Sequence, residues 1–197
     1  MGFSKKLAEL LRKRFDEPEQ QTEIDQEIET NFGRDATVII TDLSRSTAIT
    51  REKGIIHFLS LIQRFRDLVS PVLKRHDGLV AKWEGDSSFL VFKNSVSALQ
   101  FALDIRETCD SYNSTSSEEQ KIHLSQGIAS GHVILTKIDV FGDPVNTASK
   151  LGEDTAGPRE IFLSEGVFAE TKTLFQEQVF EKKSIAISGM VLTYFSV

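Results

Sequence analysis

The spacing of hydrophobic and polar positions changes along the chain, and each change marks a predicted element. A nearly continuous β-forming run over residues 36–41 predicts a strand buried on both faces, in the middle of a sheet. Apolar residues then recur at helical spacing over 55–69, which predicts a long helix. Pro71 follows, and because proline removes a backbone hydrogen bond we expect it to kink or interrupt this helix.

Two further β-forming runs, 79–83 and 88–92, flank the short glycine-containing segment 84–86. A short connection of this kind between two β runs predicts a tight hairpin. A second helical pattern covers 95–112, and the polar, serine-rich stretch 112–120 predicts a surface loop.

The second half of the chain continues with short elements. Residues 124–129 and 133–136 predict two strands with a turn at Gly131, and 145–151 predicts a helix. The remaining predicted strands lie towards the end, over 160–163, 179–187 and 190–197. The order strand, helix, hairpin, helix, strand is the split βαββαβ arrangement. It predicts an α+β, ferredoxin-like fold in which helices cover one face of a mostly antiparallel sheet.

The first thirty residues have a different pattern. Four apolar residues recur at helical spacing among basic ones, namely Leu7, Leu10, Leu11 and Phe15. This predicts a basic amphipathic helix, which could touch anionic lipid but more often forms a dimer contact or caps a core, as we expect here. Residues 16–30 are acidic and predict a connector with some helix. We therefore divide the chain into an N-terminal extension, 1–33, and one domain, 34–197.

Composition narrows the class of protein. A length of 197 residues with 40% hydrophobic content suffices for one domain with a real core, and the formal net charge of -6 does not support a nucleic-acid surface. Cys109 is the only cysteine, so no intramolecular disulfide forms, which fits a reducing cytosol. Because no apolar run reaches the ~18 residues of a membrane span, we expect a cytoplasmic protein without stable membrane insertion.

Two carboxylates stand out from this topology. Asp42 follows the first predicted strand, and Asp86 lies in the hairpin turn. The end of the first strand lies beside that turn in a βαββαβ sheet, so the two side chains should converge. Converging carboxylates suit hard divalent cations. The plain alternative is that acidic residues occur in turns because turns are exposed to water.

Four blocks of sequence now stand in an informative order: Asp42-Leu43 with Thr47; Gly78, Lys82 and Gly85-Asp86; Gly127-Ile128 with Gly131-His132-Val133; and the run from Asp139 to Leu151, DVFGDPVNTASKL. Together, from about Ala36 to the C-terminus, they resemble the catalytic domain of class III nucleotide cyclases. No single block is decisive, since short motifs occur by chance. Their order on a separately predicted βαββαβ pattern makes the resemblance strong.

The resemblance implies a two-metal site and a base-selecting pair. Asp42, Asp86 and the backbone carbonyl of Leu43 would bind two divalent cations, Mg²⁺ or Mn²⁺, that hold the triphosphate and activate the ribose 3′-hydroxyl for attack on the α-phosphorus. Lys82 and Asp139 would select adenine, the lysine facing a ring acceptor and the aspartate accepting from the amino group. This pair favours ATP and implies an adenylate cyclase.

The resemblance also implies contacts with the ribose and the phosphates. Asn146 matches the asparagine that orients the ribose, and Lys150 occupies the place of an arginine that neutralises charge on the phosphoryl group. Lysine keeps the charge but loses the two-pronged donor, which predicts low activity. Arg45, Ser46 and Thr47 form the predicted phosphate loop. Arg45-Ser46 replaces the usual Gly-Phe, so Arg45 either crowds this loop or binds phosphate itself.

A further departure lies near the C-terminus. Residues 188–189 are Ser-Gly where many members have Lys-Gly, so a second cation for the triphosphate is missing unless Lys182 or Lys183 replaces it.

Each of these assignments has a plain alternative. Lys82 could be a solvated strand lysine, Asp139 an ordinary loop acid and Asn146 a helix-start cap. The four histidines are scattered without metal-ligand spacing, and we predict no catalytic role for them.

In the family, one subunit supplies the metal aspartates and its partner supplies the base-selecting pair, the asparagine and the arginine. This chain carries both sets, which predicts a homodimer with shared active sites. Two other functions stay open: a cyclase for another nucleoside triphosphate, such as GTP or a pyrimidine in antiphage signalling, and a catalytically weak nucleotide-binding regulatory module.

Overall fold

The computed structural model describes residues 3–187 and 190–197. Within these residues, one eight-stranded sheet has the strand order β2-β3-β1-β4-β6-β8-β7, and the short β5 pairs with β4. The strands are β1 (Gly33–Leu43), β2 (Leu79–Glu84), β3 (Ser87–Phe92), β4 (Leu124–Leu135), β5 (Val140–Phe141), β6 (Ile161–Ser164), β7 (Glu181–Ile187) and β8 (Met190–Ser196). The pair β4 and β6 is parallel, and the other pairs are antiparallel.

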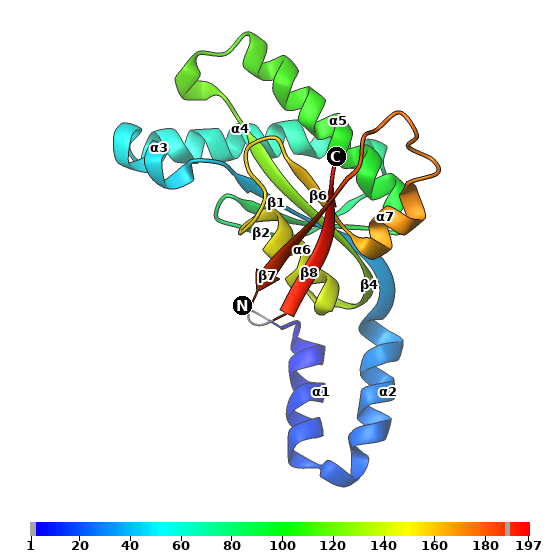
Figure 1. Ribbon diagram of the computed structural model, residues 1–197. Coiled ribbons are helices and arrows are strands. Elements are labelled where there is room, and N and C mark those ends of the chain that lie inside the picture. The colour runs from blue at the N-terminus through cyan, green and yellow to red at the C-terminus, as the bar shows by residue number, and fades with distance from the viewer. Residues whose placement is uncertain (1–2, 188–189) are drawn as a thin grey trace.

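Helices pack on both faces of this sheet (Figure 1). They are α1 (Lys5–Asp16), α2 (Gln21–Phe32), α3 (Ser46–Lys53), α4 (Ile55–Arg75), α5 (Ser95–Ser114), α6 (Asp143–Gly152) and α7 (Glu165–Thr171), with short 3-10 turns at Pro18–Gln20 and Glu118–Gln120. Side chains of α4, α5 and α7 form the main core on one face, while α6 packs on the other. The predicted βαββαβ order is confirmed as β1, α4, β2, β3, α5 and β4. The expectation that helices cover only one face of the sheet is wrong, because α6 packs on the other face.

The first strand is buried on both faces, as predicted. Ile39 belongs to the core beneath α4 and α5, while Val38 and Ile40 belong to the core beneath α6. This division follows from the alternation of side chains along a strand. β1 lies between β3 and β4, so its end is held in the middle of the sheet.

The turn predicted at Gly131 is wrong, because β4 runs through this position without interruption. Gly131 pairs with Ala36 of β1 and has a φ of 151°. A Cβ atom at Gly131 would lie 3.0 Å from Pro144 Cγ. Glycine therefore suits this position because its backbone angle is unfavourable for other residues and because α6 approaches closely. The chain reverses only after Leu135, where β5 pairs back onto β4.

Of the kink or interruption expected at Pro71, the interruption does not occur, because α4 continues to Arg75. Val69, Val72 and Leu73 are buried on both sides of the proline, while Pro71 itself is exposed. Packing of these residues against the core holds the helix although Pro71 donates no hydrogen bond. Helices α3 and α7 were not predicted, since both are short.

The N-terminal segment forms a helical hairpin that projects from one end of the sheet (Figure 1). The connector predicted over 16–30 contains a full helix, α2, because Ile24 and Ile28 pack against Leu7 and Leu10 of α1. The same apolar cluster includes Phe141 of β5. Across the described residues, no helix is both long and apolar enough to cross a bilayer.

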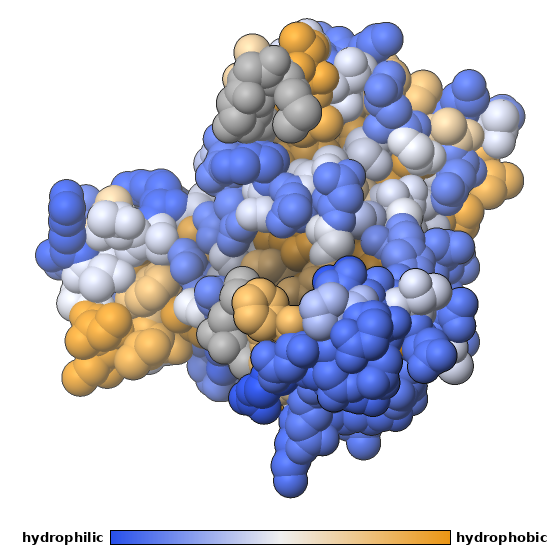
Figure 2. All heavy atoms as spheres, turned by 90° about the horizontal axis from the view of Figure 1, so that it is seen from below, coloured by the Kyte–Doolittle hydropathy of each residue, from blue (hydrophilic) through white to orange (hydrophobic). Residues whose placement is uncertain are grey.

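Figure 2 shows the surface from the end at which the hairpin projects, where the hairpin is mainly hydrophilic. A hydrophobic patch at the left lies over α3 and the start of α4, where the exposed apolar residues are Ile55, Ile56 and Leu59. A groove of about 490 Å³ lies between α2, β2 and the end of β4 and is lined in part by Leu79 and Val80, which are also exposed. These surfaces leave apolar side chains without cover.

Candidate functional site

The central strand delivers the first predicted site residue at its end. Asp42 is the penultimate residue of β1, and its Oδ1 atom accepts a hydrogen bond of 3.1 Å from the Ser87 hydroxyl. Ser87 Oγ also lies 2.8 Å from Glu153 Oε1, at the end of α6. A hydroxyl has one proton, so Ser87 can donate to only one of these carboxylates at a time. Sequence reasoning missed Glu153, which has no local signal.

The second predicted carboxylate lies in the hairpin turn. Glu84 pairs with Ser87, so the turn consists of Gly85, with a φ of 59°, and Asp86. Burial and, to a smaller extent, the nearby charge of Asp86 together raise the pKa of Asp42 to about 6, although the hydrogen bond from Ser87 acts in the opposite direction. The sheet therefore brings Asp42 and Asp86 within electrostatic reach of each other.

This donor set fits a divalent cation. Over residues 3–187 and 190–197, no group of three or more His, Cys, Asp or Glu side chains is placed to hold a metal ion. The predicted set instead consists of two carboxylates and the carbonyl of Leu43, whose side chain is buried in the main core. In the same described ranges, neither Asp42 nor Asp86 has an ion-pair partner. Uncompensated carboxylates at the end of a strand suit a hard cation.

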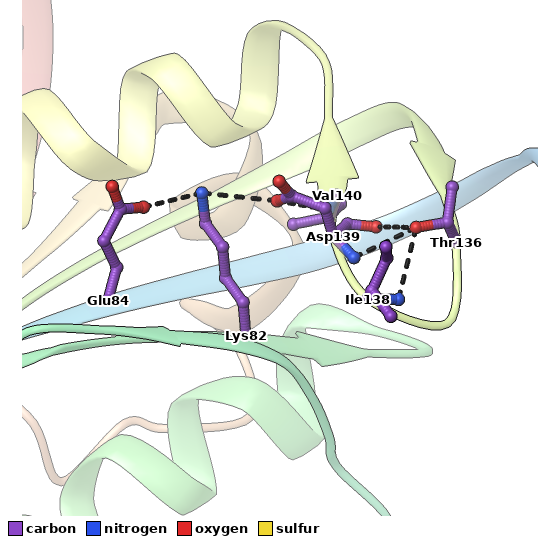
Figure 3. A network of polar contacts seen from close by, with 6 residues as sticks. All are labelled: Lys82, Glu84, Thr136, Ile138, Asp139 and Val140. Carbon is purple, nitrogen blue, oxygen red and sulfur yellow. Dashed lines mark hydrogen bonds and ion pairs between the residues drawn. The ribbon is translucent and has the colours of Figure 1, made fainter. Parts of the chain in front are cut away.

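The structure also brings together the predicted base-selecting pair, as Figure 3 shows. Lys82 Nζ lies 3.3 Å from Asp139 Oδ1 and 2.7 Å from Glu84 Oε2. It also lies 4.2 Å from the centre of the Phe89 ring. Burial lowers the pKa of Lys82, but the contacts with both carboxylates outweigh it, so the pKa is raised above its usual value. Lys82 is thus held by contacts and is not a freely solvated strand lysine.

The loop that carries Asp139 is closed by its own hydrogen bonds (Figure 3). Thr136 Oγ1 donates to the Asp139 carbonyl at 3.0 Å and accepts from the Asp139 amide, also at 3.0 Å. Asp139 Oδ1 accepts from the Val140 amide at 2.9 Å, and the residue is only 3% exposed. Asp139 is therefore a buried, oriented acceptor. Sequence reasoning missed the role of Thr136.

Helix α6 presents the other two predicted residues. It begins at Asp143 with Gly142 at the N-cap, so the alternative that Asn146 caps the helix is wrong. Asn146 and Lys150 are both exposed and lie four residues apart, which places them on one face of α6. Lys150 Nζ is 2.6 Å from Asp154 Oδ2, so it forms an ion pair with a residue just beyond the end of α6.

The predicted phosphate loop joins β1 to α3. Arg45 has a φ of 68° and is exposed, while Ser46 and Thr47 open helix α3. Their amides belong to the first turn of a helix, whose N–H groups lack partners within the helix. Arg45 lines a small pocket together with Glu118. The pKa of the Glu118 carboxyl is lowered mainly by Lys121 and to a smaller extent by the charge of Arg45.

The proposed substitutes for the missing C-terminal lysine lie on another part of the sheet. Lys182 and Lys183 belong to β7, at the edge opposite β2. Lys183 Nζ is 3.2 Å from Glu181 Oε2. Ser188 and Gly189, where the departure occurs, lie outside the described residues.

Sequence comparison identifies a family. Residues 28–196 match the model of the adenylate and guanylate cyclase catalytic domain. Among curated proteins, "Putative adenylate cyclase 3" of Rhizobium meliloti is 28% identical over 133 residues, which cover 67% of this chain and 22% of that protein. The chain spans about a fifth of the length of the curated relatives it matches.

Solved structures show the same fold. An adenylate/guanylate cyclase/hydrolase from Silicibacter pomeroyi superposes with a TM-score of 0.73 at 22% identity, covering 83% of this chain and 96% of that one. The catalytic core of a rhodopsin-guanylyl cyclase with converted specificity, in complex with ATPαS, gives a TM-score of 0.72 at 22% identity, covering 83% and 97%. The expected fold is thereby confirmed.

Proposed function

We infer that this chain, which belongs to the family of adenylate and guanylate cyclase catalytic domains, converts ATP to 3′,5′-cyclic AMP and pyrophosphate. The observation that carries the choice of ATP is the contact between Lys82 Nζ and Asp139 Oδ1 at 3.3 Å. Lys82 would donate to a ring nitrogen of adenine, and Asp139 would accept from the exocyclic amino group. Asp139 is buried and oriented by the Val140 amide, so its acceptor position is set before the base arrives.

Asp42, Asp86 and the Leu43 carbonyl would hold two divalent cations, Mg²⁺ or Mn²⁺. When bound, these ions would neutralise the triphosphate and lower the pKa of the ribose 3′-hydroxyl. The half-buried Asp42 has a pKa raised to about 6 by burial and by the charge of Asp86. A bound cation would stabilise the ionised form of this carboxylate and offset both effects. The observed excess of negative charge supports this assignment.

The remaining residues would position the ribose and the phosphates. Asn146 would orient the ribose, and Lys150 would place its ammonium near the charge that develops on the α-phosphate. The first-turn amides of Ser46 and Thr47 would donate hydrogen bonds to phosphate oxygens, with the exposed Arg45 beside them. These groups would act on the substrate through hydrogen bonds and charge. All of them belong to the proposed catalytic domain, residues 34–197, which the extension 1–33 precedes.

The active unit that we propose is a homodimer, in which one copy supplies the carboxylates and the other supplies Lys82 and its neighbours. The exposed Leu79 and Val80, which line the groove beside β2, support a partner at this face. Mixing an Asp42→Ala chain with a Lys82→Ala chain should restore one working site per heterodimer. The shared-site arrangement fails if no mixture exceeds the activity of its two parents.

The direct test is incubation of the purified protein with each of the four nucleoside triphosphates and Mn²⁺, followed by separation of the products. Cyclic AMP should be the main product. A different cyclic nucleotide as the main product would reassign the substrate. A second candidate, a catalytically weak regulatory module, is favoured by the ion pair between Lys150 and Asp154, which occupies the lysine that replaces arginine. Nucleotide binding without any cyclic product would support that module.

A further inference from the structure

A third carboxylate lies beside the proposed cation site, and no role has been assigned to it. Ile40 of β1 and Phe89 of β3 belong to the core beneath α6. Residues two apart on a strand share one face of the sheet, so Asp42 and Ser87 point to that same face. Glu153 meets them there, because it is the C-cap residue of α6. Three elements that are far apart in the chain therefore build this arrangement.

The position of Glu153 is fixed by a close contact between backbones. A Cβ atom at Gly152 would lie 2.6 Å from the Ile40 carbonyl oxygen, and one at Gly127 would lie 2.1 Å from the Ala148 carbonyl oxygen. The two glycines leave no side chain of their own between α6 and the strands β1 and β4. Glu153 directly follows Gly152, so the docking of α6 holds it next to the end of β1.

Hydroxyl groups hold both carboxylate oxygens of Glu153. Ser149, four residues earlier on α6, donates to Oε2, and the Ser87 hydroxyl lies 2.8 Å from Oε1. The same hydroxyl lies 3.1 Å from Asp42 Oδ1, and Ser87 is only 6% exposed. One proton thus faces two acceptors. The shorter contact favours Glu153 as the acceptor, which leaves Asp42 Oδ1 without a hydrogen bond from Ser87.

This arrangement affects how Asp42 can bind a cation. Within residues 3–187 and 190–197, no three His, Cys, Asp or Glu side chains are grouped so as to hold a metal ion, so Glu153 is not a third ligand. It acts on the site through Ser87. A carboxylate oxygen that accepts no hydrogen bond keeps its charge and its lone pairs for a hard cation. Groups that contact a metal ligand typically change metal affinity by about 10- to 100-fold.

We propose that Glu153 is a positioning residue of the cation site: by accepting the Ser87 proton, it keeps Asp42 Oδ1 free to bind a divalent cation. The proposal rests on the cation site of the proposed function. It assigns a role to a residue outside the four blocks of sequence that carry the resemblance to the cyclase family.

Two plainer explanations compete with this role. In the first, Glu153 only anchors the end of α6 through Ser149. In the second, it contributes only one more negative charge near the site. The neighbouring Asp154 provides a control for the second explanation, because its side chain is 55% exposed and pairs with Lys150 instead of Ser87. Asp154→Asn removes the same charge one residue away and leaves the Ser87 hydroxyl untouched.

The test measures the dissociation constant of Mn²⁺ at neutral pH from the electron paramagnetic resonance signal of the free ion. Glu153→Gln keeps the shape of the side chain but makes it a neutral acceptor, so the Ser87 proton moves to the charged Asp42. The dissociation constant should rise about tenfold or more. Asp154→Asn should raise it by about twofold at most, because the charge that it removes is exposed and screened.

Removing the hydroxyl provides the decisive comparison. Ser87→Ala should bind Mn²⁺ within about threefold of the wild type, because Asp42 Oδ1 stays free in both proteins. The double variant with Ser87→Ala and Glu153→Gln should regain this affinity to within about threefold, since the proton that moved to Asp42 is gone. A Glu153→Gln protein that is misfolded, or that has lost only a helix anchor, is not rescued by removing a second hydrogen bond.

The proposal is overturned if Glu153→Gln binds Mn²⁺ as tightly as the wild type or the Asp154→Asn control, or if the double variant stays as weak as Glu153→Gln. Asp42→Asn separates this failure from a failure of the cation site. If the wild type binds Mn²⁺ no better than Asp42→Asn, the site is misplaced, and the metal assignment of the proposed function fails together with the proposal. If the wild type makes no cyclic nucleotide but Mn²⁺ affinity follows the expected pattern, the proposed function fails and the role of Glu153 stands.

Discussion

Lys150 provides a quantitative test of the proposed chemistry. Its ammonium lies 2.6 Å from Asp154 Oδ2, and the two side chains are 49% and 55% exposed. Asp154 lies two residues beyond the end of α6, and an exposed pair at this four-residue spacing is worth about 0.3–0.5 kcal/mol. Releasing Lys150 to a substrate therefore costs roughly a factor of two in affinity. The ion pair with Asp154 therefore does not prevent a catalytic role of Lys150.

The expected effects on turnover follow from the lost or added hydrogen bonds. A hydrogen bond to a charged group contributes about 1.5–3 kcal/mol, so Lys150→Ala should lower kcat by roughly 10- to 150-fold. Lys150→Arg should raise kcat if chemistry limits the rate, because arginine offers two parallel N–H donors to phosphate oxygens. Both effects should appear in kcat more than in KM, since the contact strengthens as charge develops in the transition state.

The assay is the initial rate of cyclic AMP formation at saturating ATP and Mn²⁺. Asp154→Ala serves as the control, because it frees Lys150 without removing it and should raise kcat by no more than about twofold. The free energy of unfolding of all three variants should stay within about 0.5 kcal/mol of the wild type. If Lys150→Ala leaves kcat unchanged in a protein that makes cyclic nucleotide, Lys150 is a surface lysine and the assigned register of α6 is wrong.

Three further predictions concern the carboxylates and the packing of α6. Asp42→Asn and Asp86→Asn should each lower turnover in Mg²⁺ by about a hundredfold or more while the circular dichroism stays native, and near-normal turnover of either variant would remove the metal site from this place. In EDTA, Asp42→Asn should also stabilise the fold. The pKa of Asp42 is raised from 3.8 to about 6 in the folded protein, so this carboxyl lowers stability progressively as pH rises between these two values, and its full cost is present above about pH 6. The gain in the free energy of unfolding over the wild type should be about 1–3 kcal/mol at pH 8 and vanish below about pH 4. If the variant and the wild type have the same denaturation midpoint at pH 8 as well as at pH 4, this prediction is wrong. Gly127→Ala should cost about 1–3 kcal/mol in urea denaturation, because its Cβ would lie 2.1 Å from the Ala148 carbonyl oxygen. Gly157→Ala, with a flexible side chain as its nearest contact, is the control.

Local patterns in the sequence predicted much of the secondary structure. The continuous β-forming run of β1, the hairpin of β2 and β3, and the apolar periodicity of α4 and α5 were all confirmed. These elements bury side chains at a regular spacing, so their pattern is readable without knowing their neighbours. The convergence expected for Asp42 and Asp86 came from topology alone, because a hairpin beside a central strand places both at one end of the sheet.

The failures have a common cause. Glycine is common in turns, which is why a turn was expected at Gly131. Its strand partner on β1 and its contact Pro144 are not its neighbours in the sequence, so local sequence does not reveal them. Pro71 has the chemistry of a helix breaker, but the core beneath α4 holds the helix together. Ile24 and Ile28 are too few to mark a helix until α1 packs against them.

By itself, the sequence determined the order of elements, the βαββαβ fold and the residue types from which a site could be built, because these depend on spacing along the chain. Only the tertiary structure decided which polar groups share a hydrogen bond or an ion pair. Asp139 meets Lys82, and Glu153 reaches Ser87, through strand register and the docking of α6. Such contacts join residues that are distant in sequence, and their distances are set by packing, which no local pattern encodes.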